Sequence, residues 1–228
     1  LDGAQVAEAF MPSVGPDNVV YQGNKYYGTQ DEYTIACAEA MRTEYQDVID
    51  AGFILQIDTP VMKYDAISMT LEDFRMRFAE LVEIINHSLR GIPEDRVRIH
   101  ICYGGGRGPH TGDVNLTEFV DLAMKFNAVG FSYDQDLRHE HEWEIWKDTK
   151  LPDGKILIPG VVTHSTNTIE HPELVADRIE RFAGVVGKEN VIASTDCGLG
   201  ARVHPQIAWA KLKTLSEGAK MATERLWG

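Results

Sequence analysis

Three side chains that bind soft metal ions, one histidine and two cysteines, lie in or directly after short apolar segments of this sequence. His100 and Cys102 lie two residues apart in the segment 97–103, and Cys197 follows the segment 191–195. Residues i and i+2 of a β-strand point to the same face, so an extended segment would present the His100 imidazole and the Cys102 thiol together. One imidazole and two thiolates form a partial tetrahedral set that suits Zn²⁺. The spacing therefore indicates a zinc site, with chance and packing as the competing explanation.

A carboxylate or an exogenous ligand would complete such a site. Asp134 ends the intervening apolar segment 128–134, which makes it the candidate fourth ligand. With a firm fourth ligand the zinc would be structural, whereas with an exchangeable one it could bind an incoming thiol and lower the pKa of that thiol. We expect the second case, because structural zinc usually sits on knuckles or loops and these residues lie where strands end.

Two other strand ends carry polar side chains. His164 follows the segment 155–162, where an imidazole could act as a general acid or base near neutral pH or as a hydrogen-bonded framework group. Asp58 ends the segment 53–58, two residues after Gln56, and a buried carboxylate is costly unless it is paired. We therefore expect a substrate ammonium or a protein cation beside Asp58. His164 and Asp58 are the candidate catalytic residues, with Asp58 and Gln56 as candidate substrate-binding residues.

The loops contain weaker signals. The glycine run 104–106 lacks the G-x-G-x-x-G spacing and a following helix, so it does not predict phosphate binding. A second group of possible metal ligands lies in the polar loops: His110, His139, Glu140, His141 and Glu142. We expect this group to form a polar lid or a supporting network around the site instead of a second metal centre.

The elements that must position these residues alternate along the chain. The apolar segments of strand length are 53–58, 97–103, 128–134, 155–162 and 191–195. The helical patterns are 29–52, which opens with a capping-box sequence, a segment from Ser68 or Thr70 to Gly91, then 115–126, 171–186 and 205–226. The apolar face expected for the last helix is Ala208, Leu212, Leu215 and Met221. Residues 1–28 are expected to be irregular.

This alternation predicts a parallel sheet with helices outside it. Every expected strand ends in side chains that could do chemistry, and in a (β/α)8 barrel, or TIM barrel, the carboxyl ends of all strands meet at one mouth. We therefore predict a single TIM-barrel domain over 1–228 in preference to a doubly wound sheet. Only five strands are clear, and 18–21 is at best a weak sixth. The chain is thus expected to supply about the last five strands of a barrel, the others preceding it or coming from another chain.

The composition restricts the partners and the compartment. Twenty-two Lys and Arg against 35 Asp and Glu give a formal net charge of −13, which argues against nucleic acid or an anionic membrane as a partner. The sequence contains no apolar run of membrane-spanning length and no recognisable signal peptide. Three cysteines, with Cys37 on an apolar helical stripe and expected to be packing, do not suggest a disulfide framework. A cytoplasmic location is therefore expected.

Together these motifs resemble the catalytic, carboxyl-terminal barrel of cobalamin-independent methionine synthase. The resemblance rests on Gln56-Ile-Asp58-Thr-Pro60, His100-Ile-Cys102-Tyr-Gly104 and Ser194-Thr-Asp-Cys197-Gly198. Two further motifs look more like the shorter, single-barrel branch that includes the zinc-dependent epoxyalkane:coenzyme M transferases: Arg138-His-Glu-His-Glu-Trp143, and His164-Ser-Thr-Asn167 followed by Glu170-His-Pro-Glu173. The resemblance spans nearly the whole chain and is specific for the superfamily but not for the substrate.

The resemblance implies a ligand set for the metal. In that family a histidine, a cysteine, a glutamate and a second cysteine hold zinc, which activates a thiol for alkyl transfer. His100, Cys102 and Cys197 take three of these positions by resemblance, and Asp134 stands near the glutamate position with a shorter side chain and a locally shifted spacing.

The resemblance also implies roles for the other strand ends. His164 looks like the histidine that assists as an acid near the transferred group, and Asp58 like the aspartate that contacts the amino group of the thiol substrate. Thr59 replaces an acidic residue that is common there, which weakens the case for homocysteine as the acceptor. The segment 53–58 looks like the fourth barrel strand, so three strands would precede it.

Three functions are compatible with these observations. The first is the zinc-dependent transfer of a methyl or other alkyl group to a small thiol acceptor, as in 5-methyltetrahydropteroyltriglutamate–homocysteine methyltransferase. The second is a non-catalytic or complementing part of a split barrel enzyme, which would need a further segment or chain to complete the barrel. The third is a zinc hydrolase, in which the metal holds water. Two thiolate ligands donate charge to the metal and make the hydrolase less attractive.

Overall fold

The computed structural model describes residues 3, 5–60, 69–104, 112–135 and 138–228. Within these ranges six parallel strands form one sheet in the order in which they occur along the chain. The strands are β1 (Phe10–Val14), β2 (Ile54–Thr59), β3 (Val97–Ile101), β4 (Gly130–Tyr133), β5 (Ile156–Val162) and β6 (Ser194–Thr195). The α-helices are α1 (Pro16–Val20), α2 (Gln30–Asp50), α3 (Leu71–Ser88), α4 (Val120–Ala123), α5 (Pro172–Val186) and α6 (Pro205–Trp227).

The first strand corrects two expectations. The expectation of irregular structure is wrong for Phe10–Val14, which form β1, and for Pro16–Val20, which form α1. The weak strand candidate 18–21 lies in α1 and its C-cap. Pro12 is tolerated in β1 because an edge strand leaves one side of its backbone unpaired. The described sheet therefore has six strands instead of about five, so two strands of an eight-stranded barrel lie outside it, and not three.

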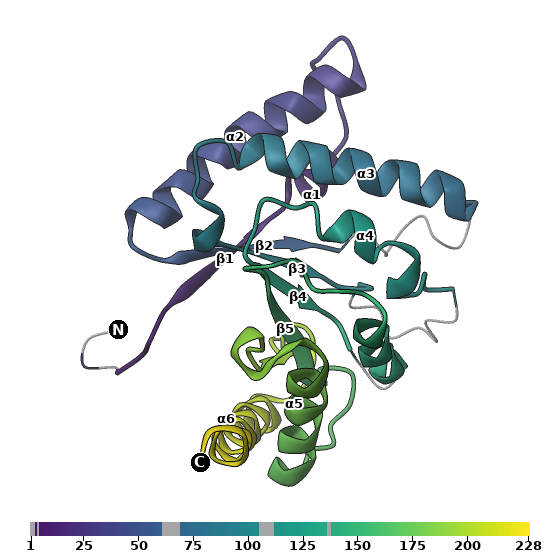
Figure 1. The fold of residues 1–228 in the computed structure, drawn as a ribbon. Helices are drawn as coiled ribbons and strands as arrows, with labels where there is room; N and C mark the ends of the chain where they lie inside the picture. The colour runs from purple at the N-terminus through teal and green to yellow at the C-terminus, as the bar shows by residue number, and fades with distance from the viewer. Residues whose placement is uncertain (1–2, 4, 61–68, 105–111, 136–137) are drawn as a thin grey trace.

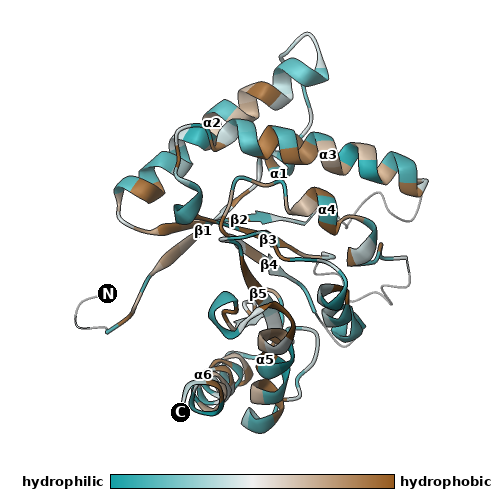
Figure 2. Cartoon of the chain, in the orientation of Figure 1, coloured by the Kyte–Doolittle hydropathy of each residue, from teal (hydrophilic) through white to brown (hydrophobic). Residues whose placement is uncertain are grey.

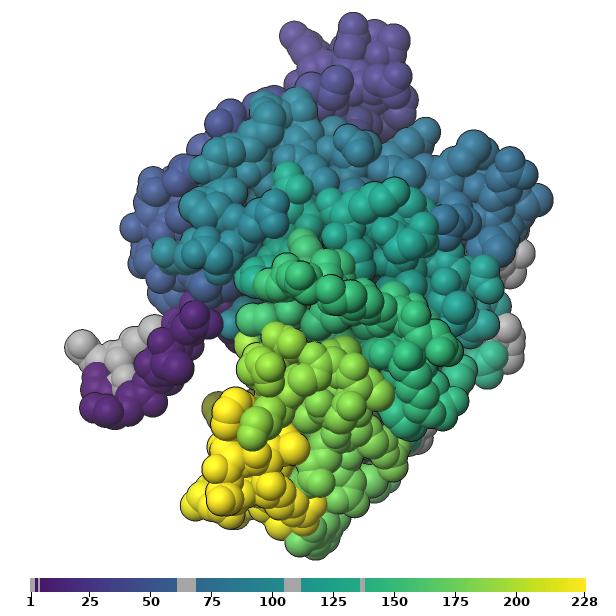
Figure 3. Space-filling view, in the orientation of Figure 1, coloured from purple at the N-terminus to yellow at the C-terminus, as the bar shows by residue number. Residues whose placement is uncertain are grey.

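The sheet is curled and open. Helices α2 and α3 lie side by side over the first strands, whereas α5 and α6 pack together beyond β5 (Figure 1). The N-terminal segment stands apart from the C-terminal helix in the space-filling view (Figure 3). Among the described strands none joins β6 back to β1, so these strands form part of a barrel without closing it. None of the helices in the described ranges has the length and apolar character needed to cross a bilayer.

Alternation along the strands separates the core from the concave face. Leu55 and Ile57 of β2 and Ile99 of β3 are fully buried in the main core, together with Phe78 of α3. The hydrophobic colouring is concentrated on the strands, and helices α2 and α3 are hydrophilic on much of their surface (Figure 2). Side chains at the intervening positions of β2 and β3 face the opposite side, which is the inside of the curled sheet.

The register of the strands brings the polar positions of that concave face into one row. Val14 of β1 pairs with Asp58 of β2, Asp58 with His100 of β3, and His100 with Ser132 of β4. Gln56 lies one row farther from the carboxyl ends, in register with Arg98. The sheet therefore delivers Asp58, His100 and Ser132 to its mouth from three consecutive strands.

Several helix starts agree with the sequence. Thr29 and Glu32 form the predicted capping box of α2, because the Thr29 side chain accepts from the Glu32 N–H and the Glu32 side chain accepts from the Thr29 N–H. Thr70 caps α3, and His171 caps α5. The alternative start at Ser68 lies outside the described residues. The expected helix 115–126 is shorter than predicted: it consists of a 3₁₀ turn, Leu116–Glu118, followed by α4.

The buried face of α6 agrees with the predicted one in part. Leu215 and Met221 pack against the core cluster that contains Val175, whereas Leu212 is 41% exposed. The buried residues of the helix are Lys211, Thr214, Gly218 and Ala222. Gly218 lies at the crossing with α5, where a Cβ would come within 2.5 Å of the Val175 side chain. A lysine of α6, and not Leu212, thus faces the inside of the molecule.

Candidate metal centre

The three predicted metal ligands converge at the mouth of the sheet. One ligand atom from each of His100, Cys102 and Cys197 lies within 4.8 Å of the other two. His100 is near the carboxyl end of β3, Cys102 directly follows that strand, and Cys197 comes two residues after β6. His100 and Cys102 are buried, and all three cysteines of the chain are free thiols. The predicted set of one nitrogen and two sulfurs is therefore present.

The orientation of the His100 ring fits a metal ligand. His100 Nδ1 lies 2.9 Å from Ser132 Oγ on the neighbouring strand. His100 Nε2 is buried and has no hydrogen-bond partner among the described side chains. A second-shell hydrogen bond to one ring nitrogen fixes the ring and leaves the other nitrogen for the metal. A buried nitrogen without a partner, facing two sulfurs, is the donor set expected for zinc.

The pKa values of the two thiols of the site are shifted in opposite directions. The contact with Cys102 lowers the pKa of Cys197 to about 3 although burial opposes it, and the proximity of His100 and the charges of His100 and His164 act in the same direction as Cys102. That same contact with Cys197, together with burial, raises the pKa of the Cys102 thiol well above its usual value. Burial lowers the pKa of His100, but the proximity and the charge of Cys197 outweigh burial and raise it. A thiolate is therefore favoured at Cys197, and thiolates are the form that binds metal.

Asp58 lies beside this cluster. Its Oδ1 is 4.0 Å from His100 Nε2 and is a buried oxygen without a hydrogen-bond partner among the described residues. Burial raises the pKa of Asp58, the charge of His100 lowers it, and the charge of Cys197 raises it. Gln56 lies one row below on the same face of β2. The charge of Arg202 also lowers the pKa of Asp58, so protein cations lie near this carboxylate. Its Oδ1, which has no hydrogen bond from the described residues, is able to accept one from a bound cation.

Asp134 belongs to a second buried group. Its carboxylate lies within 4.8 Å of ligand atoms of His164 and Asp196, and all three residues are buried. The backbone N–H of Asp134 donates to Ile101 O at 3.1 Å, which holds the end of β4 against β3. The structure thus places Asp134 with His164 and Asp196 and outside the group of His100, Cys102 and Cys197.

Asp196 organises the neighbourhood of His164 and Cys197, and the sequence analysis missed it. Its Oδ1 accepts from His164 N at 2.7 Å and from Cys197 N at 2.7 Å, and it lies 2.9 Å from His164 Nδ1. Burial lowers the pKa of His164, but the bond to Asp196 and the charges of Asp196, Asp134 and Cys197 raise it to about 9. One feature of the sequence could have indicated this role: Asp196 directly precedes Cys197, a proposed metal ligand, at the end of an apolar segment.

One histidine of the loop after β4, His139, forms a separate network. His139 Nε2 lies 3.1 Å from Asp113 Oδ2, and His139 Nδ1 lies 3.3 Å from Glu142 Oε1. The Tyr103 ring stacks on the His139 ring with centroids 3.8 Å apart, and its hydroxyl donates to Glu142 Oε2 at 3.3 Å. This network ties the loop to the end of β3 beside Cys102.

The other members of the second candidate metal group do not join this network. Glu140 pairs with Arg178 of α5 at 3.0 Å, and His141 is exposed. His110 and glycines 105 and 106 lie outside the described residues.

Comparisons with known proteins agree with this geometry. Residues 15–221 match the family model described as the cobalamin-independent synthase, catalytic domain. A methionine synthase of Sulfurisphaera tokodaii is 26% identical over 207 residues, which are 89% of this chain and 53% of the relative. A methionine synthase of Thermococcus kodakarensis is 23% identical over 95% of this chain and 58% of the relative.

Two further similarities extend the comparison. A 2-hydroxypropyl-CoM lyase of Xanthobacter autotrophicus is 25% identical over 96% of this chain and 65% of the relative. The fold superposes with a TM-score of 0.76 on a B12-independent methionine synthase of a Shewanella species in complex with selenomethionine, at 21% identity over 94% of this chain and 62% of that one.

The extent of these matches has two consequences. The chain spans between about half and two thirds of the length of these relatives. The six-stranded curled sheet is part of the barrel that the solved structure contains. Because the family model covers most of the sequence, this chain belongs to the family of the cobalamin-independent synthase catalytic domain.

Proposed function

We propose that this chain carries the catalytic site of a zinc-dependent transferase that moves a methyl or other alkyl group onto a small thiol acceptor. The observation that carries the proposal is the convergence of His100 Nε2, which has no partner among the described residues, with the thiols of Cys102 and Cys197. When bound there, zinc would hold the acceptor as a thiolate and make it nucleophilic near neutral pH.

The protein residues divide the remaining work. His100, Cys102 and Cys197 would hold the metal, and Asp134 stays the proposed fourth ligand or a neighbour of that position. Asp196 holds His164 by its Nδ1, so that Nε2 carries the proton that the imidazole can give or take. Below the raised pKa of about 9, His164 is protonated and is available as an acid near the transferred group.

The charges at the mouth favour an acceptor that carries an ammonium group. Asp58 Oδ1 is unpartnered among the described atoms and accepts the ammonium in this proposal, with Gln56 on the same face of the strand. Thr59, which replaces the acidic residue common in the family, donates to Asp17 Oδ2 at 3.3 Å. A carboxylate therefore lies next to position 59 even though that position itself is a threonine. An aminothiol such as homocysteine fits these carboxylates better than the anionic coenzyme M does.

Completion of the barrel is part of the proposal. Phe10, Met11 and Val14 of the edge strand β1 are 48%, 43% and 43% exposed, and an apolar, unpaired edge is a surface that pairs with another strand. We propose that 1–228 belongs to one barrel domain and that a further segment or chain supplies the strands that complete it. We also propose that the enzyme works in the cytoplasm. The family match disfavours the hydrolase and the non-catalytic alternatives.

Metal content and activity of cysteine variants test the proposal. Purified protein should contain about one zinc per chain and should catalyse alkylation of an aminothiol by a methyl or alkyl donor. Cys102→Ser should lose zinc and activity, whereas Cys37→Ser, which removes an equally buried thiol on α2, should keep both. The proposal fails if freshly purified protein has no metal and Cys102→Ser retains full activity.

A further inference from the structure

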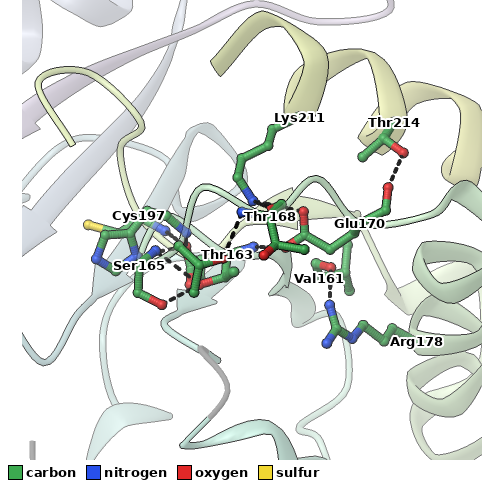
Figure 4. Close-up of polar contacts among 12 residues, drawn as sticks. Val161, Thr163, Ser165, Thr168, Glu170, Arg178, Cys197, Lys211 and Thr214 are labelled. Carbon is green, nitrogen blue, oxygen red and sulfur yellow. Dashed lines mark hydrogen bonds and ion pairs between the residues drawn. The ribbon is translucent and has the colours of Figure 1, made fainter. Parts of the chain in front are cut away.

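The lysine that α6 turns inward contacts the loop that carries His164. Lys211 Nζ lies 2.9 Å from Glu170 Oε2 and also donates to the backbone carbonyl of Thr168 (Figure 4). The exposed fraction of the side chain is 0% for Lys211 and 7% for Glu170. An ammonium is kept in such a place only when charged and hydrogen-bonding partners replace its water.

Glu170 transmits this contact to the end of β5. Its Oε1 accepts from the backbone N–H of Thr163 at 2.8 Å, directly before His164. Thr214, one turn after Lys211 on α6, donates to the backbone carbonyl of Glu170 at 2.7 Å. Both ends of the Glu170 residue, its carboxylate and its carbonyl, are therefore held by α6.

Two carboxylates thus hold two consecutive peptide groups. The N–H of Thr163 donates to Glu170, and the N–H of His164 donates to Asp196. The Asp196 side begins at the metal-ligand strand β6, and the Glu170 side begins at α6. The backbone that orients the His164 imidazole is therefore held by Asp196 and by Glu170. Lys211 anchors Glu170, the carboxylate that lies farther from the proposed metal ligands.

We propose that Lys211 and Glu170 are positioning residues for His164. A buried ion pair is weak evidence of stabilisation, because apolar residues of similar volume often stabilise as well or better, whereas it does specify one arrangement of the groups it joins. Here the arrangement specified is the direction of the His164 ring relative to Asp196 and Cys197. We call the contacts of Lys211 and Glu170 with Thr168 and Thr163 the clamp. Its effect on catalysis rests on the proposed function, whereas the contacts themselves do not.

The first test is a double-mutant cycle on transfer activity. Lys211→Met should lower kcat for alkyl transfer about tenfold or more and change KM for the thiol less than about threefold, because geometry at the acid is lost while substrate contacts remain. In a His164→Asn background the same substitution should change kcat less than about twofold, since Lys211 acts through that histidine. An equal loss in both backgrounds, or no loss in the first, overturns the proposal.

Two further variants separate positioning from folding. Glu170→Gln/Lys211→Met removes both charges, leaves no buried ion unpaired and keeps an acceptor for Thr163 N–H, so it should fold and still show the loss of kcat. Arg225→Met is the matched control, because Arg225 also joins α6 to α5, through Glu173, Asp177 and Glu180, but far from the loop. The control should keep the kcat of the unaltered protein, and a control that falls as far as Lys211→Met would contradict the proposal.

Amide hydrogen exchange tests whether the clamp holds the backbone at 163–170, and this test does not require transfer activity. The peptide that contains 163–170 should exchange about tenfold faster or more in Lys211→Met than in the unaltered protein and in Arg225→Met, compared at equal distances below their melting temperatures. Unchanged exchange overturns the clamp. If the unaltered protein shows no transfer activity but the exchange difference appears, the proposed function fails while the positioning of His164 stands.

Discussion

Gly160 of β5 and Asp196 lie closer together than any residue with a side chain would allow at position 160. A Cβ on Gly160 would lie 2.1 Å from Asp196 Cα and 2.3 Å from Asp196 Cβ. Gly160 pairs with Ser194 of β6, and the register of the two strands shifts between Gly160 and Val162. The glycine therefore permits the approach that brings Asp196 beside His164 and Cys197.

Adding one methyl group at this position should disrupt the site. Gly160→Ala is expected to lower the free energy of unfolding by about 1–3 kcal/mol or more, because the backbones of β5 and β6 must separate. It should also weaken zinc binding, since Cys197 follows Asp196. Gly184→Ala is the control, because nothing lies within 4 Å of a Cβ there; in the last turn of α5 it should stabilise by up to about 1 kcal/mol. Urea unfolding and zinc titration measure both effects, and equal stabilities would contradict the close approach.

Ser132 should tune the metal affinity through His100. Ser132→Ala removes the hydroxyl 2.9 Å from His100 Nδ1 and leaves the three metal ligands in place. Loss of such a partner typically costs about 10–100-fold in metal affinity. Ser88→Ala is the matched control, because it removes an equally buried hydroxyl, which donates to Ile85 O at 2.7 Å far from the site. Competition with a chromophoric chelator gives both affinities, and an equal effect of the two variants would show that Ser132 has no special role.

His139 should make stability depend on alkaline pH. Burial lowers the pKa of His139, but its bonds with Asp113 and Glu142 and their charges outweigh burial and raise it from 6.5 to about 9. The folded state thus holds the proton more tightly, so this stabilisation is fully present below about pH 6.5 and is lost as the pH rises through about 9. Its size is of the order of 3 kcal/mol.

The measurement compares the unaltered protein with His139→Gln by urea unfolding. The difference in free energy of unfolding should be large at pH 6 and should shrink by pH 10. If the difference does not change over this range, His139 is not held as a protonated imidazolium by Asp113 and Glu142. Tyr103, which stacks on the ring, is unchanged in both proteins.

Asp17 should lower the free energy of unfolding at neutral pH. Burial raises its pKa from 3.8 to about 6, and the charge of Asp58 adds to the effect although hydrogen bonds, including that from Thr59, oppose it. Stability associated with the protonated form is present below about pH 3.8 and lost as the pH rises through about 6. Asp17→Asn should therefore stabilise by about 3 kcal/mol at pH 7.5 and by little at pH 4.

The same substitution should affect the acceptor. If Asp17 and Asp58 together attract an ammonium group, Asp17→Asn should raise KM for an aminothiol and leave KM for a thiol without an amino group unchanged. Thermal unfolding at the two pH values and steady-state kinetics with the two thiols measure these effects. A variant that is less stable at pH 7.5 would refute the assigned burial cost.

The strand ends were predictable because each rests on a short local pattern. His100 and Cys102 share a strand face through their spacing alone, and the apolar segment before Cys197 carries that thiol to the same mouth. The helix caps at Thr29 and His171 are equally local. Strand β1 was missed because its residues, Phe10–Val14, include a proline and show no alternation of apolar and polar side chains.

The parts that escaped prediction depend on partners far along the chain. Lys211 reads as one of several polar positions on an amphipathic helix, and only the contact with Glu170 shows that it is buried. Asp196 gains its role from His164 and from the space left by Gly160. The position of Asp134 beside His164 likewise depends on how the strands curl. Spacing in a sequence carries no information about such distances.

The contacts of Lys211 have a consequence for how the site can diverge. Lys211 lies on a helix that packs on β5, and its described partners are Thr168 and Glu170, in the loop after β5, and not the three proposed metal ligands. Substitutions at Lys211 should therefore change the direction of His164 and leave His100, Cys102 and Cys197 in place. Turnover and metal affinity would then be able to change independently of each other.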